Sequence, residues 1–423
     1  RRMYIARLTD KLLRDNLETF GAVLVEGPKW CGKSTSAARA AKSELYIADP
    51  TGGYRNKRLA ELDVTSVLAG ERPRLIDEWQ EVPSLWDAVR YECDRARGEA
   101  GQFLLTGSAT PLDLNKPLHS GAGRIGRVRM DTLTQLELGK SSGDTSLRAL
   151  FEGAKPEGLS SGTVLDIASA VCRGGWPVAA RLTDRQAMMI ASSYIDAVAS
   201  EDLSRIDGRT RKPEMVRRLI SALARNEATL AAKRTVVADT GMAGLAPIST
   251  STVSSYIDAL TRVFFVDDIS AWNPALRSPV RIRSAKKHHI VDPSLAAAAL
   301  GATPEALVSD LKTLGFMFES LVTHDMLVYA RLMGAEVMHY RDDSNLEVDL
   351  IVQRKDGAWG AFEVKLGYMQ EDQAASSLLA LERKMTERGE KPPAVKAVIV
   401  GVGGIARMRS DGVVVVPFDT LGA

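Results

Sequence analysis

One glycine-rich stretch near the start of the chain restricts the possible folds more than any other feature. Residues 27–34 read Gly-Pro-Lys-Trp-Cys-Gly-Lys-Ser and fit the pattern G-x-x-x-x-G-K-[ST] at every fixed position. An apolar run, Ala22–Glu26, comes directly before this stretch, and a helical pattern begins at Lys33. In this strand–loop–helix setting the pattern is typical of a phosphate-binding loop at the edge of a parallel α/β sheet.

The chemistry of this loop predicts that it binds the phosphates of ATP. Its glycines permit a tight turn in which backbone N–H groups point at phosphate oxygens, and the following helix adds a favourable dipole. We expect Lys33 to reach the β- and γ-phosphates and the Ser34 hydroxyl to ligate Mg²⁺. A chance Gly-Lys turn is the alternative, and the strand and helix on either side argue against it. The expected nucleotide-binding residues are Gly27, Pro28, Lys29, Trp30, Cys31, Gly32, Lys33, Ser34 and Thr35.

Two further apolar runs end in polar side chains suited to ATP hydrolysis. The run 74–77 ends in Asp77 and Glu78. We expect Asp77 to hold Mg²⁺, directly or through water, and Glu78 to polarise the attacking water. The run that begins at Phe103 ends in Thr106 and Ser108, whose hydroxyls would lie beside the γ-phosphate. A solvated strand end is the alternative in each case. Strands that alternate with helices here predict a parallel sheet covered on both faces.

Composition and charge fit a chain of two or three ordinary globular domains. The chain has 423 residues, of which 45% are hydrophobic and 26% charged, with a net charge of +2. This balance neither requires nor excludes nucleic acid, so any basic surface must be local. Three scattered cysteines without metal-ligand spacing favour a reduced, cytoplasmic protein. We expect neither a signal peptide nor a membrane-spanning segment.

The pattern of apolar, polar and turn-forming residues divides the chain into four predicted regions. A phosphate-loop core covers residues 1–138. A linker and helical lid region covers 139–234, and its Ser- and Gly-rich start at Gly139–Gly162 is predicted to be a linker or mobile loop. Residues 235–289, with two helices around a Gly/Pro turn and then an alternating strand, favour a winged helix. Residues 290–423 return to an α/β pattern.

Four charged residues in the last region form a second candidate site. Glu363 and Lys365 lie two apart on a predicted strand and share one face, Asp349 lies on the preceding strand, and Glu319 lies on the helix before both. Asp349 and Glu363 could bind Mg²⁺ against a phosphate while Lys365 orients or deprotonates water. The alternatives are an exposed ion pair, or a fold that keeps these residues and binds DNA or protein without cleavage.

As a set, these motifs resemble a known family. The phosphate loop, Leu-Ile-Asp-Glu-Trp at 75–79, Leu-Thr-Gly-Ser at 105–108 and Gly123-Arg124 are similar to bacterial and archaeal AAA-type ATPases whose C-terminal half is the domain of unknown function DUF4143. Similarity to that domain lies at 252–260, 291–293, 318–321, 340–341, 347–349 and 362–365. The succession of acid, acid and Glu-x-Lys resembles the PD-(D/E)xK nuclease superfamily. The resemblance implies an AAA-type core and a PD-(D/E)xK-like C-terminal α/β domain.

The resemblance also implies a partner of the same kind. AAA-type enzymes usually need an arginine from a neighbouring subunit, and Arg124 and Arg127 are the candidates for that role or for a sensor within the same chain. A basic turn that enters a strand is the alternative. We therefore expect a homo-oligomer, with a hexameric ring as one possible form.

Two features indicate DNA as the target of the ATPase. The helix from Thr252 carries small and polar groups, and the stretch Arg277–His289 holds five cations that could neutralise phosphates. A strand with solvated charges, or a winged helix that packs against its neighbours, is the alternative. The expected function is an ATP-driven motor or switch that acts on DNA, with possible cleavage. The competing hypothesis is a signalling or defence ATPase whose C-terminal half binds a protein.

Overall fold

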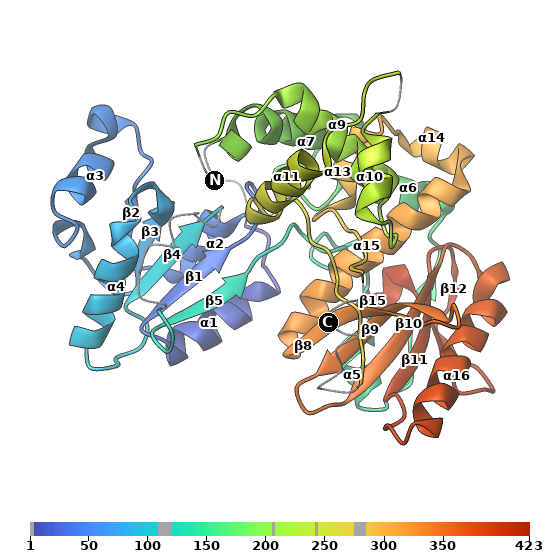
Figure 1. The fold of residues 1–423 in the computed structure, drawn as a ribbon. Helices are drawn as coiled ribbons and strands as arrows, with labels where there is room; N and C mark the ends of the chain where they lie inside the picture. The colour runs from blue at the N-terminus through green and yellow to red at the C-terminus, as the bar shows by residue number, and fades with distance from the viewer. Residues whose placement is uncertain (1–3, 109–120, 205–207, 242–243, 275–284) are drawn as a thin grey trace. The chain divides into compact units, whose positions relative to one another are not determined.

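The computed structural model describes residues 4–108, 121–204, 208–241, 244–274 and 285–423. These residues fold into two compact units (Figure 1). Unit 1 takes the described residues of 1–132, 200–211 and 258–265, and unit 2 takes those of 133–199, 212–257 and 266–423. Each unit is therefore assembled from stretches that are distant in sequence. The predicted limits at 138, 234 and 289 remain a prediction.

Unit 1 is built on a five-stranded sheet in the order β2-β3-β4-β1-β5 (Figure 1). All of its strand pairs are parallel, which confirms the predicted sheet. The register places Asp77 of β3 opposite Thr106 of β4. The strands are β1 (Ala22–Glu26), β2 (Ser43–Tyr46), β3 (Arg74–Asp77), β4 (Phe103–Gly107) and β5 (Ile125–Arg129).

Alternating side chains of β1 pack against helices on the two faces of this sheet. Val23 and Val25 are buried in the cluster that includes α1 and α2, whereas Ala22 and Leu24 belong to the cluster that includes α3 and α4. Burial on both faces explains why this strand is a continuous apolar run in the sequence. The helices are α1 (Thr9–Thr19), α2 (Lys33–Ala40), α3 (Thr51–Leu62) and α4 (Ser84–Arg95).

The first half of unit 2 is helical, and it contains the region predicted to be a winged helix except for residues 258–265, which belong to unit 1. Its two predicted helices are present, but the strand predicted at Phe264–Ile269 is not formed. In the described part of this stretch, Val266 and Ile269 make only single bridges, and the positive φ of 57° at Phe264 interrupts an extended chain. The helices are α6 (Val164–Arg173), α7 (Asp184–Ala197), α9 (Pro213–Arg225), α10 (Lys233–Asp239), α11 (Thr250–Arg262), α13 (Pro293–Ala299) and α14 (Pro304–Ser309).

The second half of unit 2 is a mixed six-stranded sheet in the order β13-β14-β11-β10-β9-β8. Figure 1 labels its strands β8 to β11. The core side chains of this sheet pack against α16 (Glu371–Glu387). Another helix, α15 (Leu311–Leu332), packs on strands β8 and β10. The strands are β8 (Ala335–Arg341), β9 (Glu347–Arg354), β10 (Trp359–Lys365), β11 (Val395–Val400), β13 (Arg407–Met408) and β14 (Val414–Pro417).

The stretch Gly139–Gly162 is folded, which corrects its prediction as a linker or mobile loop. It contains α5 (Leu147–Phe151) and two short strands that pair with the end of the chain. Its serines bond to that same end: Ser141 Oγ donates to Leu421 O at 2.6 Å and Ser160 Oγ donates to Asp419 Oδ2 at 2.7 Å. The pairs are β6 (Thr145–Ser146) with β15 (Leu421–Gly422) and β7 (Leu159–Ser160) with β12 (Gly404–Ile405).

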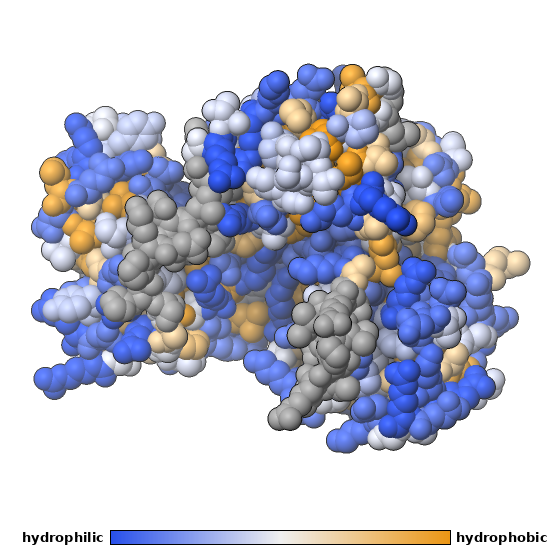
Figure 2. Space-filling model, in the orientation of Figure 1, coloured by the Kyte–Doolittle hydropathy of each residue, from blue (hydrophilic) through white to orange (hydrophobic). Residues whose placement is uncertain are grey.

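The face of the molecule drawn in Figure 2 is mainly hydrophilic. Hydrophilic residues predominate on that face, and apolar residues occur there singly or in small groups (Figure 2). Within the described ranges, no helix combines the length and the apolar character needed to cross a membrane.

Candidate functional site

The loop after β1 has a backbone that only glycine allows at its first position. Gly27 has a φ of 150°, and a Cβ there would lie 1.9 Å from the Met130 carbonyl oxygen. Gly32 has a φ of 106° at the start of α2. These two glycines therefore let the loop turn sharply from β1 into the helix and bring its N–H groups inward.

The Arg7 guanidinium holds the loop in place, and no sequence motif had indicated this residue. Its Nη1 donates to Cys31 O at 2.7 Å, and its Nη2 donates to Asp131 O at 2.8 Å. The Cys31 thiol also donates to Met130 O at 3.3 Å. A buried guanidinium thus ties the main chain of the loop to the segment that follows β5, and the Cys31 thiol is buried against the same segment.

The Lys33 ammonium lies inside the loop with neutral partners. It donates to Gly27 O at 3.0 Å and to Pro28 O at 2.7 Å, and the residue is only 5% exposed. Because carbonyl groups bear no net charge, its positive charge is left for an anion. Ser34, in the first turn of α2, is partly buried, and Thr35 is exposed. This arrangement fits ATP phosphates, with Ser34 and Asp77 available to a Mg²⁺ ion.

The two polar strand ends meet beside the loop. Thr106 Oγ1 donates to Asp77 Oδ1 at 2.6 Å and accepts from Glu78 N at 3.3 Å. Ser108 Oγ donates to Glu78 Oε2 at 3.3 Å. All four residues predicted at the ends of β3 and β4 are therefore joined in one hydrogen-bonded group. They meet because the two strands pair in parallel and end at the same edge of the sheet.

Glu78 has an unusual backbone conformation, and its side chain is partly buried. Its φ of 55° is rare for a residue with a side chain, and Gln80 Nε2 donates to its carboxylate. Burial raises the pKa of Glu78 and Asp77 adds to this rise, while the charge of Lys33 opposes it. A carboxyl with a raised pKa beside a phosphate loop has the properties of a group that handles a proton or orients water.

Lys29 is paired with a residue from far along the chain. Its ammonium forms an ion pair with Asp202, whose side chain is 7% exposed. Asp202 ends the π-helical turn Val198–Asp202 that continues α7. Sequence analysis did not predict this contact, because Asp202 belongs to no motif and lies in a stretch with a helical pattern. Trp30, next in the loop, is about half exposed.

The two candidate arginines are both paired within unit 1. Arg124 Nε lies 2.8 Å from Asp94 Oδ1, and Arg127 Nη1 lies 3.1 Å from Glu26 Oε2. The Arg124 carbonyl accepts from Ala22 N at the start of β1, about 16 Å of strand away from the loop. Arg124 therefore does not reach the nucleotide loop of its own chain. Whether either arginine serves a neighbouring subunit remains a prediction.

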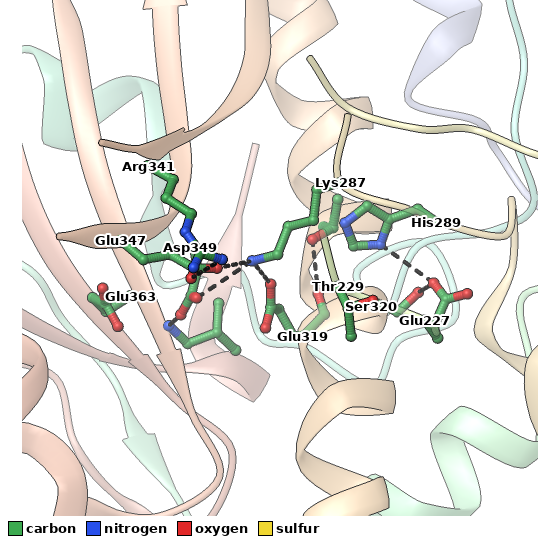
Figure 3. Close-up of polar contacts among 12 residues, drawn as sticks. Glu227, Thr229, Lys287, His289, Glu319, Ser320, Arg341, Glu347, Asp349 and Glu363 are labelled. Atoms are coloured by element: carbon green, nitrogen blue, oxygen red, sulfur yellow. Dashed lines mark hydrogen bonds and ion pairs between the residues drawn. The ribbon is translucent and has the colours of Figure 1, made fainter. Parts of the chain in front are cut away.

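The C-terminal charges converge as the sequence suggested (Figure 3). In the β9–β10 hairpin Phe362 pairs with Leu350, so the next pair places Glu363 opposite Asp349. Lys365 Nζ lies 3.1 Å from Asp349 Oδ2 and 2.6 Å from Glu363 Oε2. Asp349 Oδ2 also accepts from the Val364 amide at 2.8 Å.

Lys287 enters the same cluster, which the sequence analysis did not foresee (Figure 3). Its ammonium pairs with Glu319 and lies 3.5 Å from Asp349 Oδ1 and 3.6 Å from Glu347 Oε1. With a side chain only 2% exposed, Lys287 is not available to DNA phosphates. This corrects its prediction as one of five phosphate-binding cations. Arg277, Arg281 and Arg283 of that stretch lie outside the described residues.

The cluster balances its own charge. Burial raises the pKa of Glu319 to about 7, with a further rise from Asp349 and an opposing effect of Lys287. Burial alone would also raise the pKa of Asp349, but Lys287 and Lys365 outweigh it and lower this pKa to about 2. Burial, followed by the charge of Asp349, raises the pKa of Glu363 well above its usual value. The two lysines thus favour the ionised form of Asp349, whereas burial and the charge of Asp349 disfavour the ionised form of Glu363.

These residues do not fit a divalent metal as they are arranged. Among the described residues, no group of three or more His, Cys, Asp or Glu side chains is placed to hold a metal ion. Each carboxylate oxygen of Asp349 faces an ammonium group, from Lys287 on one side and from Lys365 on the other. The predicted roles of Asp349 and Glu363 as metal ligands therefore have no support in this geometry.

A phosphate loop, an acid-ended strand and a hydroxyl-ended strand at one edge of a parallel sheet define the class of P-loop ATPases. Comparison with protein families gives the same class. Residues 19–139 match the AAA domain, residues 314–421 match the domain of unknown function DUF4143, and residues 165–306 match the domain of unknown function DUF8612. The chain thus carries an AAA-type ATPase domain followed by a C-terminal DUF4143 domain, as the motifs suggested. The segments 252–260 and 291–293, expected to belong to DUF4143, lie instead within the match to DUF8612.

Two mycobacterial proteins are similar to this chain over nearly its whole length. Uncharacterized protein Mb2031c of Mycobacterium bovis is 27% identical over 412 residues, which are 97% of this chain and 82% of that protein. Uncharacterized protein Rv2008c of Mycobacterium tuberculosis gives the same values. Among solved structures, the Walker-type ATPase PABY2304 of Pyrococcus abyssi aligns with a TM-score of 0.43 and 12% identity, over 70% of this chain and 96% of that chain.

We expect Lys287→Ala to destabilise the folded chain far more than Lys286→Ala. Removing the buried ammonium leaves Glu319 and Asp349 partly uncompensated, which costs about 3–5 kcal/mol for a broken buried pair. The exposed neighbour Lys286 is a matched control, expected to change stability by about 0.5 kcal/mol or less. Urea unfolding followed by near-ultraviolet circular dichroism measures both. Equal unfolding midpoints for the two variants would contradict the structural role of Lys287.

Proposed function

We propose that unit 1 hydrolyses ATP with the help of Mg²⁺. The observation that carries this proposal is the hydrogen-bonded group of Asp77, Glu78 and Thr106 beside a buried Lys33 whose charge has no carboxylate partner among its hydrogen bonds. Such a group provides a cation for phosphates and an acidic side chain for water at one edge of the sheet. Both are what phosphoryl transfer to water requires.

Each residue has a distinct part in this proposal. Lys33 and the loop N–H groups bind and orient the phosphates, and Ser34 and Asp77 would hold Mg²⁺. The bound ion neutralises phosphate charge. Glu78 orients the attacking water and accepts its proton, while Ser108 and Gln80 fix the carboxylate by donating to it. Thr106 fixes Asp77 through its hydroxyl.

Lys33→Ala should lose ATP hydrolysis, and Glu78→Gln should keep ATP binding while hydrolysis slows. A positioned general base contributes on the order of 10²–10⁴-fold, and the amide keeps the shape of the side chain but cannot take a proton. Phosphate release and binding of a fluorescent ATP analogue measure the two effects. Lys42→Ala, which removes an exposed lysine of unit 1, is the control and should retain full turnover. Normal turnover in Lys33→Ala would exclude the proposed site.

We further propose that unit 2 engages DNA. The support is the convergence of Asp349, Glu363 and Lys365, which resembles the arrangement in metal-dependent nucleases, together with the helix pair α10–α11 in the winged-helix-like region. Cleavage is the less favoured part of this proposal, because Lys287 occupies the space among the carboxylates. A DNA-binding module without cleavage agrees better with the geometry.

A protein-binding module is the second candidate, and a specific observation favours it. The polar groups expected to face DNA from α11 are only partly exposed, and Ser254 Oγ accepts from Lys233 Nζ at 3.0 Å. The cations of the basic stretch that the structure describes include the buried Lys287. In this alternative the ATPase acts as a switch in signalling or defence, and its C-terminal half binds a protein.

Binding to linear and four-way-junction DNA separates the two candidates. If unit 2 engages DNA, the affinity should fall as the salt concentration rises. A plot of log affinity against log salt concentration should have a slope of about −0.9 for each phosphate neutralised on duplex DNA. The DNA should remain intact with Mg²⁺ or Mn²⁺. Cleavage that is lost in Asp349→Ala would show an active nuclease instead, and no binding at low salt would favour the protein partner.

We also propose that the chain assembles with copies of itself when ATP is bound, as a ring in which Arg127 or Arg124 reaches a neighbour. Arg127 suits this role because it is about half exposed on β5, an edge strand of its sheet. An arginine supplied in this way is worth on the order of 10³–10⁵ in rate. Arg127→Ala should therefore lower turnover by orders of magnitude, with Arg95→Ala, another exposed arginine, as control. Mass photometry with and without ATP measures the assembly, and a monomer with full activity would exclude it.

A further inference from the structure

Lys287 lies among the carboxylates of the acidic cluster in unit 2 (Figure 3). Its ammonium contacts Glu319 on α15 and approaches Glu347 and Asp349 on β9. The carboxylates that surround it therefore come from two separate elements. Asp349 is the shared neighbour, because its Oδ1 faces Lys287 at 3.5 Å and its Oδ2 faces Lys365 at 3.1 Å.

The main chain fixes Lys287 in this position. Lys287 N donates to Ile269 O at 2.9 Å, and Ile269 N donates back to Lys287 O at 3.1 Å. On the next residue, His288 N donates to Thr229 O at 2.9 Å. Backbone bonds on two successive residues, to two different parts of unit 2, therefore hold the main chain at Lys287 in place.

Glu227 strengthens the same attachment from the interior. Both of its carboxylate oxygens accept from Ile290 N at 3.1 Å, and one accepts from Ser320 Oγ at 2.6 Å. Ser320 is the neighbour of Glu319 on α15, so Glu227 joins the helix that carries the acid to the segment that carries the lysine (Figure 3). The pairing of Lys287 with Glu319 is thus built into the packing of the unit.

An ammonium and a divalent metal ion cannot share this space. Mg²⁺ needs near-octahedral oxygen ligands at about 2.0–2.1 Å, and several of them are usually water. Lys287 already lies within 3.6 Å of two carboxylates on β9 and in contact with a third on α15, at a side chain 2% exposed. An added ion would therefore lie against a fixed positive charge in a medium that screens poorly.

We propose that Lys287 is a built-in cation that replaces the divalent metal of this site, and that its removal converts the cluster into a divalent-cation site. The inference rests on the proposed nuclease-like character of unit 2. The ligands of the ion in the variant would be Glu319, Asp349 and Glu347, whose side chains would have to move closer together than they lie around the ammonium. Lys365 keeps its place beside Glu363. In the wild-type chain the cluster takes up no Mg²⁺ or Mn²⁺, and its ion pairs hold α15 and β9 together.

Titration of the full, nucleotide-free chain with Mn²⁺ tests this proposal, with free Mn²⁺ followed by electron paramagnetic resonance. Lys287→Gln and Lys287→Met remove the charge and keep most of the side-chain volume. Each should bind one more Mn²⁺ per chain than the wild type, and Lys287→Gln/Asp349→Asn should lose this extra ion. Lys286→Gln, one residue away and exposed, is the control and should match the wild type. Any weak binding at the loop of unit 1 is common to all variants and cancels.

Two outcomes would overturn the proposal. One is Mn²⁺ uptake by the wild-type chain that Asp349→Asn abolishes, and the other is a folded Lys287 variant without additional uptake. Circular dichroism establishes folding, and added Mn²⁺ should raise the thermal midpoint of Lys287→Gln. If neither Lys287 variant folds, the wild type and Asp349→Asn decide the matter, since equal uptake supports the proposal. DNA plays no part in this readout, so a failure of the proposed DNA binding would be seen separately.

Discussion

The parallel pairing of β3, β4 and β1 is the constraint on which the ATPase unit depends. Since parallel strands all end at the same edge, the loop after β1, the acids after β3 and the hydroxyls after β4 meet there without any further device. The apolar runs that form these strands are buried on both faces, which keeps the edge rigid. Catalytic residues on rigid strand ends hold their geometry better than residues on long loops do.

The two candidate sites contain the same kind of group in opposite electrical settings. Lys33 and Lys287 are both buried lysines. The partners of Lys33 are carbonyl oxygens, so its charge attracts an anion, whereas Lys287 is surrounded by carboxylates that cancel its charge. An ammonium with neutral partners is ready for a phosphate. An ammonium within an acidic cluster instead serves to hold elements together, at a desolvation cost that good geometry offsets.

The sequence predicted those parts of the sites that are contiguous motifs or near neighbours along the chain. The loop at 27–34 and the acids Asp77 and Glu78 each belong to a short pattern that fixes its own geometry. Asp349 and Glu363 could be paired in advance because a hairpin joins them, and its turn includes Gly357 with a φ of 87°. Their meeting with Lys365 follows from the two-residue period of a strand.

The parts that the sequence could not predict come from distant segments without a pattern of their own. Arg7, Asp202 and Lys287 are charged residues that belong to no motif with the partners they meet in the fold. Only the tertiary fold turns them inward, and no local propensity encodes that. The prediction of a strand from Phe264 was wrong for the opposite reason. Alternating apolar residues indicated a strand, but the positive φ of Phe264 interrupts the extended chain.

The strand pairs formed by residues 145–160 have a consequence for the order in which the chain can fold. Their partners are residues 404–405 and 421–422, which lie at the far end of the sequence. Because a ribosome makes the chain from the amino end, β6 and β7 emerge more than two hundred residues before the strands they need. The unit 1 sheet can form early, since all five of its strands precede residue 130. Unit 2 can be completed only after residues 421–422 have been made, because β6 pairs with them as β15.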